Sequence, residues 1–149
     1  MRPVGVVRGG RSDPIDDDWD RLSCEIMLDP AQFSAEATAG LADLSHIEVI
    51  YSFNRVPDNE VQKGARYPRG RKDWPKVGIF TQGGKGRPNC VGVTACTVLS
   101  VDGLKISVQG LDAIDGTPVL DIKPVMTRFL PRGPIREPDW AQESMKQYW

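Results

Sequence analysis

The sequence predicts a mostly β protein: a small antiparallel β-barrel-like single domain with short helices and a C-terminal helix. Short runs of alternating apolar and polar residues, separated by tight turns, are typical of such a fold. The chain has 149 residues, which fits one domain over 1–149. Its 40% hydrophobic and 26% charged residues are close to the globular average, so it can bury a core without disulfides or metal.

The N-terminal third predicts a pair of strands followed by short helical turns. Residues 3–8 are rich in valine and end at Gly9-Gly10, which predicts a strand and a turn. Residues 23–28 predict its partner. Residues 30–43 are rich in alanine, but Gly40 limits helix length, so we expect one or two short turns there.

The middle of the chain predicts four more strands. The clearest is residues 47–54, which place Ile47, Val49, Tyr51 and Phe53 on one face. Residues 77–81, 91–99 and 104–110 predict the others, and the Asp-Gly pair in 101–104 favours a hairpin between the last two. Residues 57–75 hold three prolines and two glycines, which predicts a long loop.

The last part of the chain predicts a helix after an irregular stretch. Residues 125–134 show no periodic pattern. Asp139 and Gln142 have the spacing of a helix-capping pair, which predicts a helix over 140–148. We expect Trp140 and Met145 to pack back on the sheet.

Cysteine and histidine content excludes several kinds of site. The three cysteines, Cys24, Cys90 and Cys96, show no C-x-x-C spacing, so we expect buried thiols. His46 is the only histidine, which excludes a zinc site that needs two imidazoles, and we expect no metal. The sequence has no apolar run long enough for a membrane span and no secretory signal, so we expect a cytoplasmic protein without a membrane partner.

Charge is distributed unevenly although the formal net charge is only −1. Residues 55–87, which we call the basic segment, contain nine basic residues against three acidic ones, with Tyr67 and Trp74 among them. Acidic residues gather instead at 13–20. Lysine and arginine with interleaved aromatic rings suit contact with phosphates and unpaired bases, whereas a solvated surface loop is the alternative interpretation.

Two segments have compositions that simple strands do not explain. Residues 83–89 (Gly-Gly-Lys-Gly-Arg-Pro-Asn) combine three glycines with two cations, which favours binding of an anion or carboxylate, or else forms a plain hairpin loop. Residues 110–124 hold three carboxylates beside apolar residues and the turn sequence Asp-Gly-Thr-Pro. Because an unpaired buried charge is costly, a cationic or polyhydroxyl ligand is expected there.

These two segments, with Val4–Arg8 and Ser45–Ile50, resemble the TrmO/TsaA-like (YaeB-like) family of S-adenosylmethionine-dependent methyltransferases. The pairing of Arg-Pro-Asn before an apolar strand with Asp-Gly-Thr-Pro-Val-Leu-Asp-Ile-Lys-Pro downstream carries the resemblance, which spans about residues 3–124. It implies a barrel-like fold, a homodimer, S-adenosyl-L-methionine as cofactor and tRNA as partner. The implied reaction is N6-methylation of threonylcarbamoyladenosine next to the anticodon.

The resemblance also implies a set of site residues. The cofactor contacts are expected at Phe53, Asn54, Arg55, Gly83, Lys85, Arg87, Pro88, Asn89, Val93, Leu111, Asp112, Ala113, Ile114, Asp115, Gly116, Thr117 and Pro118. Asp112 and Asp115 are expected to orient the reactants or accept a proton, with Arg87 as the third catalytic residue. From the charge of the basic segment, and not from the resemblance, we expect contacts to substrate phosphates at Arg66, Arg69, Arg71 and Lys72.

Two other functions fit the same residues. The near-neutral charge favours a methyltransferase acting on a small molecule or another RNA. Gly83 stands where the family pattern has an arginine, which favours a non-catalytic module that binds S-adenosylmethionine or RNA.

Overall fold

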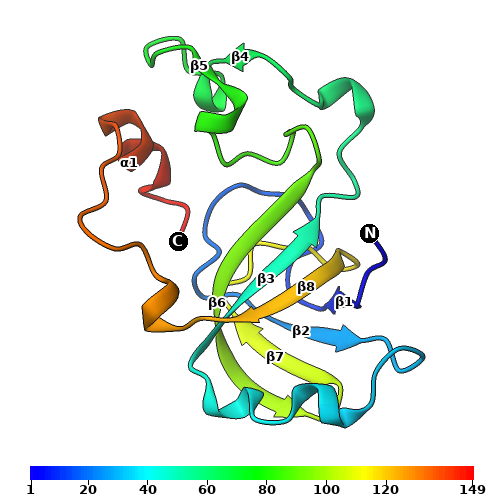
Figure 1. Cartoon of the computed structure of the whole chain (residues 1–149). Coiled ribbons are helices and arrows are strands. Elements are labelled where there is room, and N and C mark those ends of the chain that lie inside the picture. Colours follow the sequence, from blue (N-terminus) through cyan, green and yellow to red (C-terminus); the bar gives the residue numbers. More distant parts are fainter.

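Six antiparallel strands close into a barrel in the computed structural model, which describes residues 1–149 (Figure 1). The strand order around the barrel is β1-β2-β7-β6-β3-β8. The strands are β1 (Gly5–Arg8), β2 (Ser23–Leu28), β3 (His46–Ser52), β6 (Val91–Asp102), β7 (Lys105–Gln109) and β8 (Pro118–Pro124). The predicted barrel-like fold, and the pairing of the first two strands, are confirmed.

The core fills the barrel with the residues that point inward. In β3 the buried residues Ile47, Val49 and Tyr51 alternate with more exposed ones, as the sequence predicts. In β7 Ile106 and Val108 do the same. The alternation works because successive side chains of a strand point to opposite faces, so a period of two separates core from surface.

The predicted hairpin joins β6 and β7. Asp102 pairs with Lys105, so Gly103 and Leu104 form the turn. Gly103 has φ of +57°, a left-handed conformation that favours glycine. Strand β6 extends to Asp102, beyond the predicted end at residue 99.

The strand predicted over 77–81 is wrong beyond its second residue. Only β5 (Val77–Gly78) is extended, and it pairs with β4 (Ala65–Arg66) in a separate two-stranded sheet. A 3₁₀ turn, η5 (Ile79–Thr81), follows and buries Ile79. The turn is stabilised by Gln82, whose amide donates to the Val77 carbonyl at 3.0 Å.

Strand β8 was not predicted, yet it closes the barrel by pairing with both β1 and β3. The alternation of buried and exposed residues in β8 is interrupted by a register shift against β3. Ile50 pairs with Asp121, but the next residue, Tyr51, pairs with Val119. A bulge of this kind shifts the inward-facing positions by one residue and hides the period of two.

Short 3₁₀ turns occupy the connections. The expected turns in 30–43 are η1 (Ala35–Thr38) and η2 (Leu41–Asp43), separated by Gly40 at φ +79°. The others are η3 (Asp58–Glu60), η4 (Pro68–Gly70) and η6 (Thr127–Phe129).

The C-terminal helix α1 (Asp139–Met145) is confirmed, but its expected cap and packing are wrong. Pro138 is the N-cap, and Asp139 lies inside the first turn without a capping hydrogen bond. Trp140 contacts Trp74 of the basic segment, with ring centroids 6.5 Å apart, instead of the barrel. The helix docks there because Glu143 accepts hydrogen bonds from Arg71 and Trp74.

All three cysteines are free thiols; Cys24 and Cys96 are buried as expected, whereas Cys90 is only half-buried, so the expectation is wrong for that residue. Burial raises the pKa of Cys24 to about 11 and that of Cys96 to about 12, so both stay protonated near neutral pH. Among the helices, none has the length and apolar character that a membrane crossing requires.

Candidate functional site

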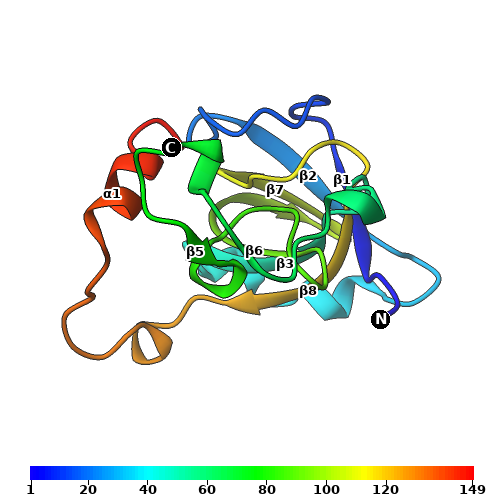
Figure 2. The same ribbon diagram turned by 90° about the horizontal axis from the view of Figure 1, so that it is seen from above.

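The loops that hold most of the predicted cofactor residues meet at one end of the barrel. Strand registers establish this: Ser52 at the end of β3 pairs with Val91 at the start of β6, and Gln109 at the end of β7 pairs with Ser23. Residues 9–22, 53–90 and 110–117 therefore border the same opening, which we call the barrel mouth. Figure 2 views the molecule from this end.

Asp112 lies in the barrel mouth, where three hydroxyl groups donate to its carboxylate. Oδ1 accepts hydrogen bonds from Tyr51 of β3 and Thr94 of β6, and Oδ2 accepts one from Tyr148. The Tyr51 and Thr94 hydroxyls also lie 3.1 Å from each other. The barrel strands thus fix one oxygen of Asp112, while the C-terminal segment reaches the other.

The two phenols act as hydrogen-bond donors. Burial, together with the negative charge of Asp112, raises the pKa of Tyr51 far above its ordinary value. The same two causes raise the pKa of Tyr148. Neither phenol can therefore serve as a base near neutral pH, which leaves the carboxylate as the acceptor of the cluster.

Asp115 and Arg55 form a second contact set at the mouth. The Asp115 carboxylate accepts from the Gly9 amide at 2.9 Å through Oδ1. Arg55 donates to the carbonyl oxygens of Asp115 at 3.1 Å and Ser12 at 3.3 Å. Gly116 has φ of +83°, so the predicted Asp-Gly turn is confirmed.

The glycine-rich loop, residues 83–89, is linked to the Asp115-Gly116 turn through residues 53–55 and also through residues 11–16, because Lys85 contacts Asp16 and the Asp115 amide donates to the Arg11 carbonyl at 2.8 Å. The Phe53 amide donates to the Cys90 carbonyl at 2.7 Å, and the Cys90 amide donates to Arg87 at 3.0 Å. Within residues 53–55, Arg55 donates to the Asp115 carbonyl. No hydrogen bond joins residues 87–89 directly to residues 115–117.

Other predicted cofactor residues contribute in different ways. Leu111, Ala113 and Thr117 are buried, and Leu111 and Ala113 belong to the barrel core. Val93 lies on the outer face of β6 with 59% exposure, and the structure does not bring its side chain into the mouth. Asn54 and Asn89 are exposed loop residues beside the mouth; Ile114, Pro88 and Pro118 are half-buried.

Most predicted phosphate contacts already have partners within the chain. Arg69 forms a two-bond ion pair with Asp17, which lowers the pKa of that carboxyl. Arg71 pairs with Asp73 and Glu143. Arg66 donates to Gln82. Lys72 is exposed and has no salt bridge, so of the four it is the one free to meet a phosphate.

Sequence reasoning missed two parts of the site. Residues 13–20, which we call the acidic segment, pair with the basic segment through Arg69–Asp17 and Lys85–Asp16, the latter at 3.3 Å. The opposite charges of residues 13–20 and 55–87 were a usable signal for this pairing. Tyr148 had no such signal, because nothing in a local pattern connects it to a carboxylate 36 residues away.

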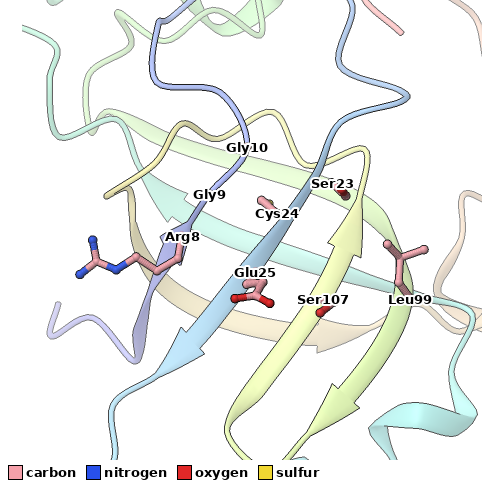
Figure 3. Close-up of a pocket in the computed structure, with 8 residues that line it drawn as sticks. All are labelled: Arg8, Gly9, Gly10, Ser23, Cys24, Glu25, Leu99 and Ser107. Atoms are coloured by element: carbon pink, nitrogen blue, oxygen red, sulfur yellow. The ribbon is translucent and has the colours of Figure 1, made fainter.

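Two hollows on the molecule contain none of the four residues that form the Asp112 cluster, Tyr51, Thr94, Asp112 and Tyr148. One, of about 280 Å³, is bordered by β1, β2, β7 and β6 (Figure 3). Its lining residues are Arg8, Gly9, Gly10, Ser23, Cys24, Glu25, Leu99 and Ser107, none of them a predicted cofactor contact. The other, of about 240 Å³, lies between α1 and the basic segment and includes Arg69 and Trp74.

Known proteins resemble this chain in sequence and in fold. A family model described as the tRNA-methyltransferase O N-terminal domain matches residues 13–129. A probable S-adenosyl-L-methionine-binding protein of Methanothermobacter thermautotrophicus is 38% identical over 128 residues, 83% of this chain and 88% of that protein. The human tRNA (adenine(37)-N6)-methyltransferase is 32% identical over 99 residues, covering 66% of this chain and 22% of its own length.

A solved structure of TrmO from Pseudomonas aeruginosa has the same fold, with a TM-score of 0.72 and 22% identity. The match covers 91% of this chain and 60% of that one. This chain thus spans about a fifth of the human relative and about three fifths of the solved one. Because the family model matches most of the sequence, the chain belongs to the tRNA-methyltransferase O N-terminal domain family.

Proposed function

We propose that the chain binds S-adenosyl-L-methionine at the barrel mouth and methylates a tRNA adenosine. The observation that carries the proposal is the convergence of Asp112, the Asp115-Gly116 turn and residues 53–55 at one opening. The relatives named as S-adenosyl-L-methionine-binding proteins and tRNA (adenine(37)-N6)-methyltransferases support it. The finer substrate that we propose is N6 of threonylcarbamoyladenosine next to the anticodon.

The residues of the mouth suit the functional groups of this cofactor. Carboxylates such as Asp112 accept hydrogen bonds from ribose hydroxyls and favour a sulfonium charge. Arg55, whose side chain is at the mouth, and Arg87 can pair with a carboxylate. We expect the backbone groups of residues 111–114 to contact an adenine edge, while the side chains of Leu111 and Ala113 pack in the core.

Transfer requires alignment more than strong acid or base chemistry. The bound cofactor supplies a methyl group already activated by its positive sulfur. The chain has to hold the acceptor nitrogen in line and exclude water, which can lower the barrier by about 7–11 kcal/mol. Asp115 is the better candidate to accept the acceptor's proton, because its Oδ2 has no protein donor whereas both oxygens of Asp112 are engaged.

Two measurements on the purified protein test the proposal. Calorimetric titration with S-adenosylmethionine should give saturable heat that S-adenosylhomocysteine competes away. Methyl incorporation should then be greater into bulk tRNA than into a metabolite extract. Incorporation into metabolites alone would favour the small-molecule alternative, and the absence of any binding would contradict the proposal.

A cofactor-binding module without transfer is the second candidate, because Gly83 replaces an arginine of the family pattern. Nothing lies within 4 Å of a Cβ placed on Gly83, so Gly83→Arg fits the fold. If the chain only binds the cofactor, Gly83→Arg should create transfer activity that the parent lacks. Activity in the parent would dismiss this candidate.

Lys72→Ala is expected to weaken tRNA binding by a modest factor, about two- to fivefold at physiological salt, because one free phosphate contact is lost. The slope of log K against log salt should fall by about 1. Filter binding over a salt series measures both. Lys123→Ala, a change to an exposed lysine of β8, is the matched control and should leave both values unchanged.

We also propose a cytoplasmic homodimer, following the family resemblance. Exposed apolar side chains such as Phe80, Val93 and Phe129 are available for an interface. Light scattering on the purified protein should give about twice the 16.5 kDa chain mass. A mass of one chain at micromolar concentration would contradict the proposal.

A further inference from the structure

The C-terminal segment, residues 139–149, runs from α1 to the barrel mouth, where Tyr148 contacts the candidate site. The Asp18 amide donates to the Gln147 carbonyl at 2.9 Å, and the Trp19 amide donates to the Tyr148 carbonyl at 3.0 Å. These two bonds hold residues 147 and 148 alongside the acidic segment. The Tyr148 hydroxyl then reaches the Asp112 carboxylate, to which it donates.

The two oxygens of Asp112 are held by parts of the fold with different stability. Tyr51 and Thr94 hold Oδ1, are both buried, and belong to barrel strands with continuous ladders on β3 and β6. Tyr148 holds Oδ2 from a segment outside the barrel whose neighbours Gln147 and Trp149 are exposed. Segments with few buried contacts open at a lower free energy than the core, so the contact with Tyr148 breaks first.

A phenol hydroxyl and a ribose hydroxyl can each donate one hydrogen bond to a carboxylate oxygen, so they compete for the same acceptor. We infer that Tyr148 is an internal competitor for the cofactor, which must displace its hydroxyl from Asp112 Oδ2 to bind. This inference rests on the proposed function. The cofactor's apparent affinity is then its intrinsic affinity multiplied by the fraction of molecules in which Tyr148 has left Asp112.

Removal of the phenol hydroxyl tests the inference. Tyr148→Phe is expected to bind S-adenosylmethionine about tenfold more tightly than the parent, because one hydrogen bond to a charged group no longer has to be broken. Tyr148→Ala should bind at least as tightly. Tyr67→Phe is the matched control: it removes a phenol hydroxyl outside the Asp112 cluster, keeps the ring, and should leave the cofactor affinity unchanged.

A double-mutant cycle with Asp112→Asn shows whether the gain passes through this carboxylate. The gain from Tyr148→Phe should shrink to less than about twofold in the Asp112→Asn background. Equal or weaker binding by both Tyr148 variants, with the parent still binding, would overturn the inference and leave the proposed function standing. If neither the parent nor any variant bound the cofactor, Tyr148→Phe and Tyr148→Ala included, both the inference and the proposed function would be overturned.

Discussion

Asp112→Asn is expected to weaken S-adenosylmethionine binding by about 30-fold or more, which corresponds to about 2 kcal/mol. The reason is the position of this carboxylate: it is the negative group whose Oδ1 is fixed by Tyr51 and Thr94 and whose Oδ2 is turned toward Tyr148 at the mouth. Asparagine keeps the shape and one oxygen acceptor but removes the charge that favours a sulfonium cation. Calorimetry against the parent measures the loss.

The control for Asp112→Asn is Asp102→Asn, which makes the same chemical change at the exposed end of β6 beside the β6–β7 turn. It should bind the cofactor like the parent. Thermal melts of both variants show whether the fold is kept. If Asp112→Asn bound the cofactor as the parent does while remaining folded, Asp112 could not be a cofactor contact.

Sequence patterns predicted best those features that depend on one strand or one turn. Alternation in 47–54 predicted which side chains of β3 are buried, and the Asp-Gly pair predicted the β6–β7 hairpin. Both signals are local, because strand periodicity and turn chemistry act over a few residues. The compositions of residues 83–89 and 110–117, which predicted ligand-binding loops, are also local signals, and both segments border the barrel mouth.

Non-local contacts were beyond such reasoning. The four side chains of the Asp112 cluster come from β3, β6, the loop before β8 and the C-terminal segment. Asp112 itself was a predicted site residue, but its partners Tyr51, Thr94 and Tyr148 were not. Each looks unremarkable in its own stretch of sequence, and only barrel closure and the docking of α1 bring the four together.

The expected phosphate contacts show a related limit. A count of charges identified the basic segment but could not show that Asp17 and Glu143 already pair with Arg69 and Arg71. Ion pairs between separate segments depend on tertiary structure. The positive charge available to a partner at this surface is therefore smaller than composition suggests, with Lys72 as an unpaired member.

Gly92→Ala is expected to destabilise the protein by about 3 kcal/mol, the upper part of the range for overpacked cores. Gly92 pairs with Tyr51 across β3 and β6. A Cβ on Gly92 would lie 2.5 Å from the Cε2 and Cζ atoms of the Tyr51 ring and 2.8 Å from its hydroxyl oxygen. Real Cβ atoms do not approach so closely, so the ring or the strand has to move.

The Tyr51 ring has little freedom to move away. It is 1% exposed, packs edge-on against Phe53 with centroids 5.3 Å apart, and holds Asp112 by its hydroxyl. Gly64→Ala, where nothing lies within 4 Å of the new Cβ, is the matched control and should change the free energy of unfolding by less than about 0.5 kcal/mol. Urea denaturation measures both variants.

Displacement of the Tyr51 ring should also disturb Asp112, so Gly92→Ala is expected to bind S-adenosylmethionine less tightly even at temperatures where it remains folded. Tyr51→Phe separates the two effects, because it keeps the ring in place and removes only the donor to Asp112. The Tyr51→Phe variant should bind S-adenosylmethionine less tightly, while the packing of the ring against Gly92 stays unchanged. Full stability in Gly92→Ala would mean that β3 and β6 can separate there, and the close packing of Tyr51 would then not be what fixes the Asp112 carboxylate.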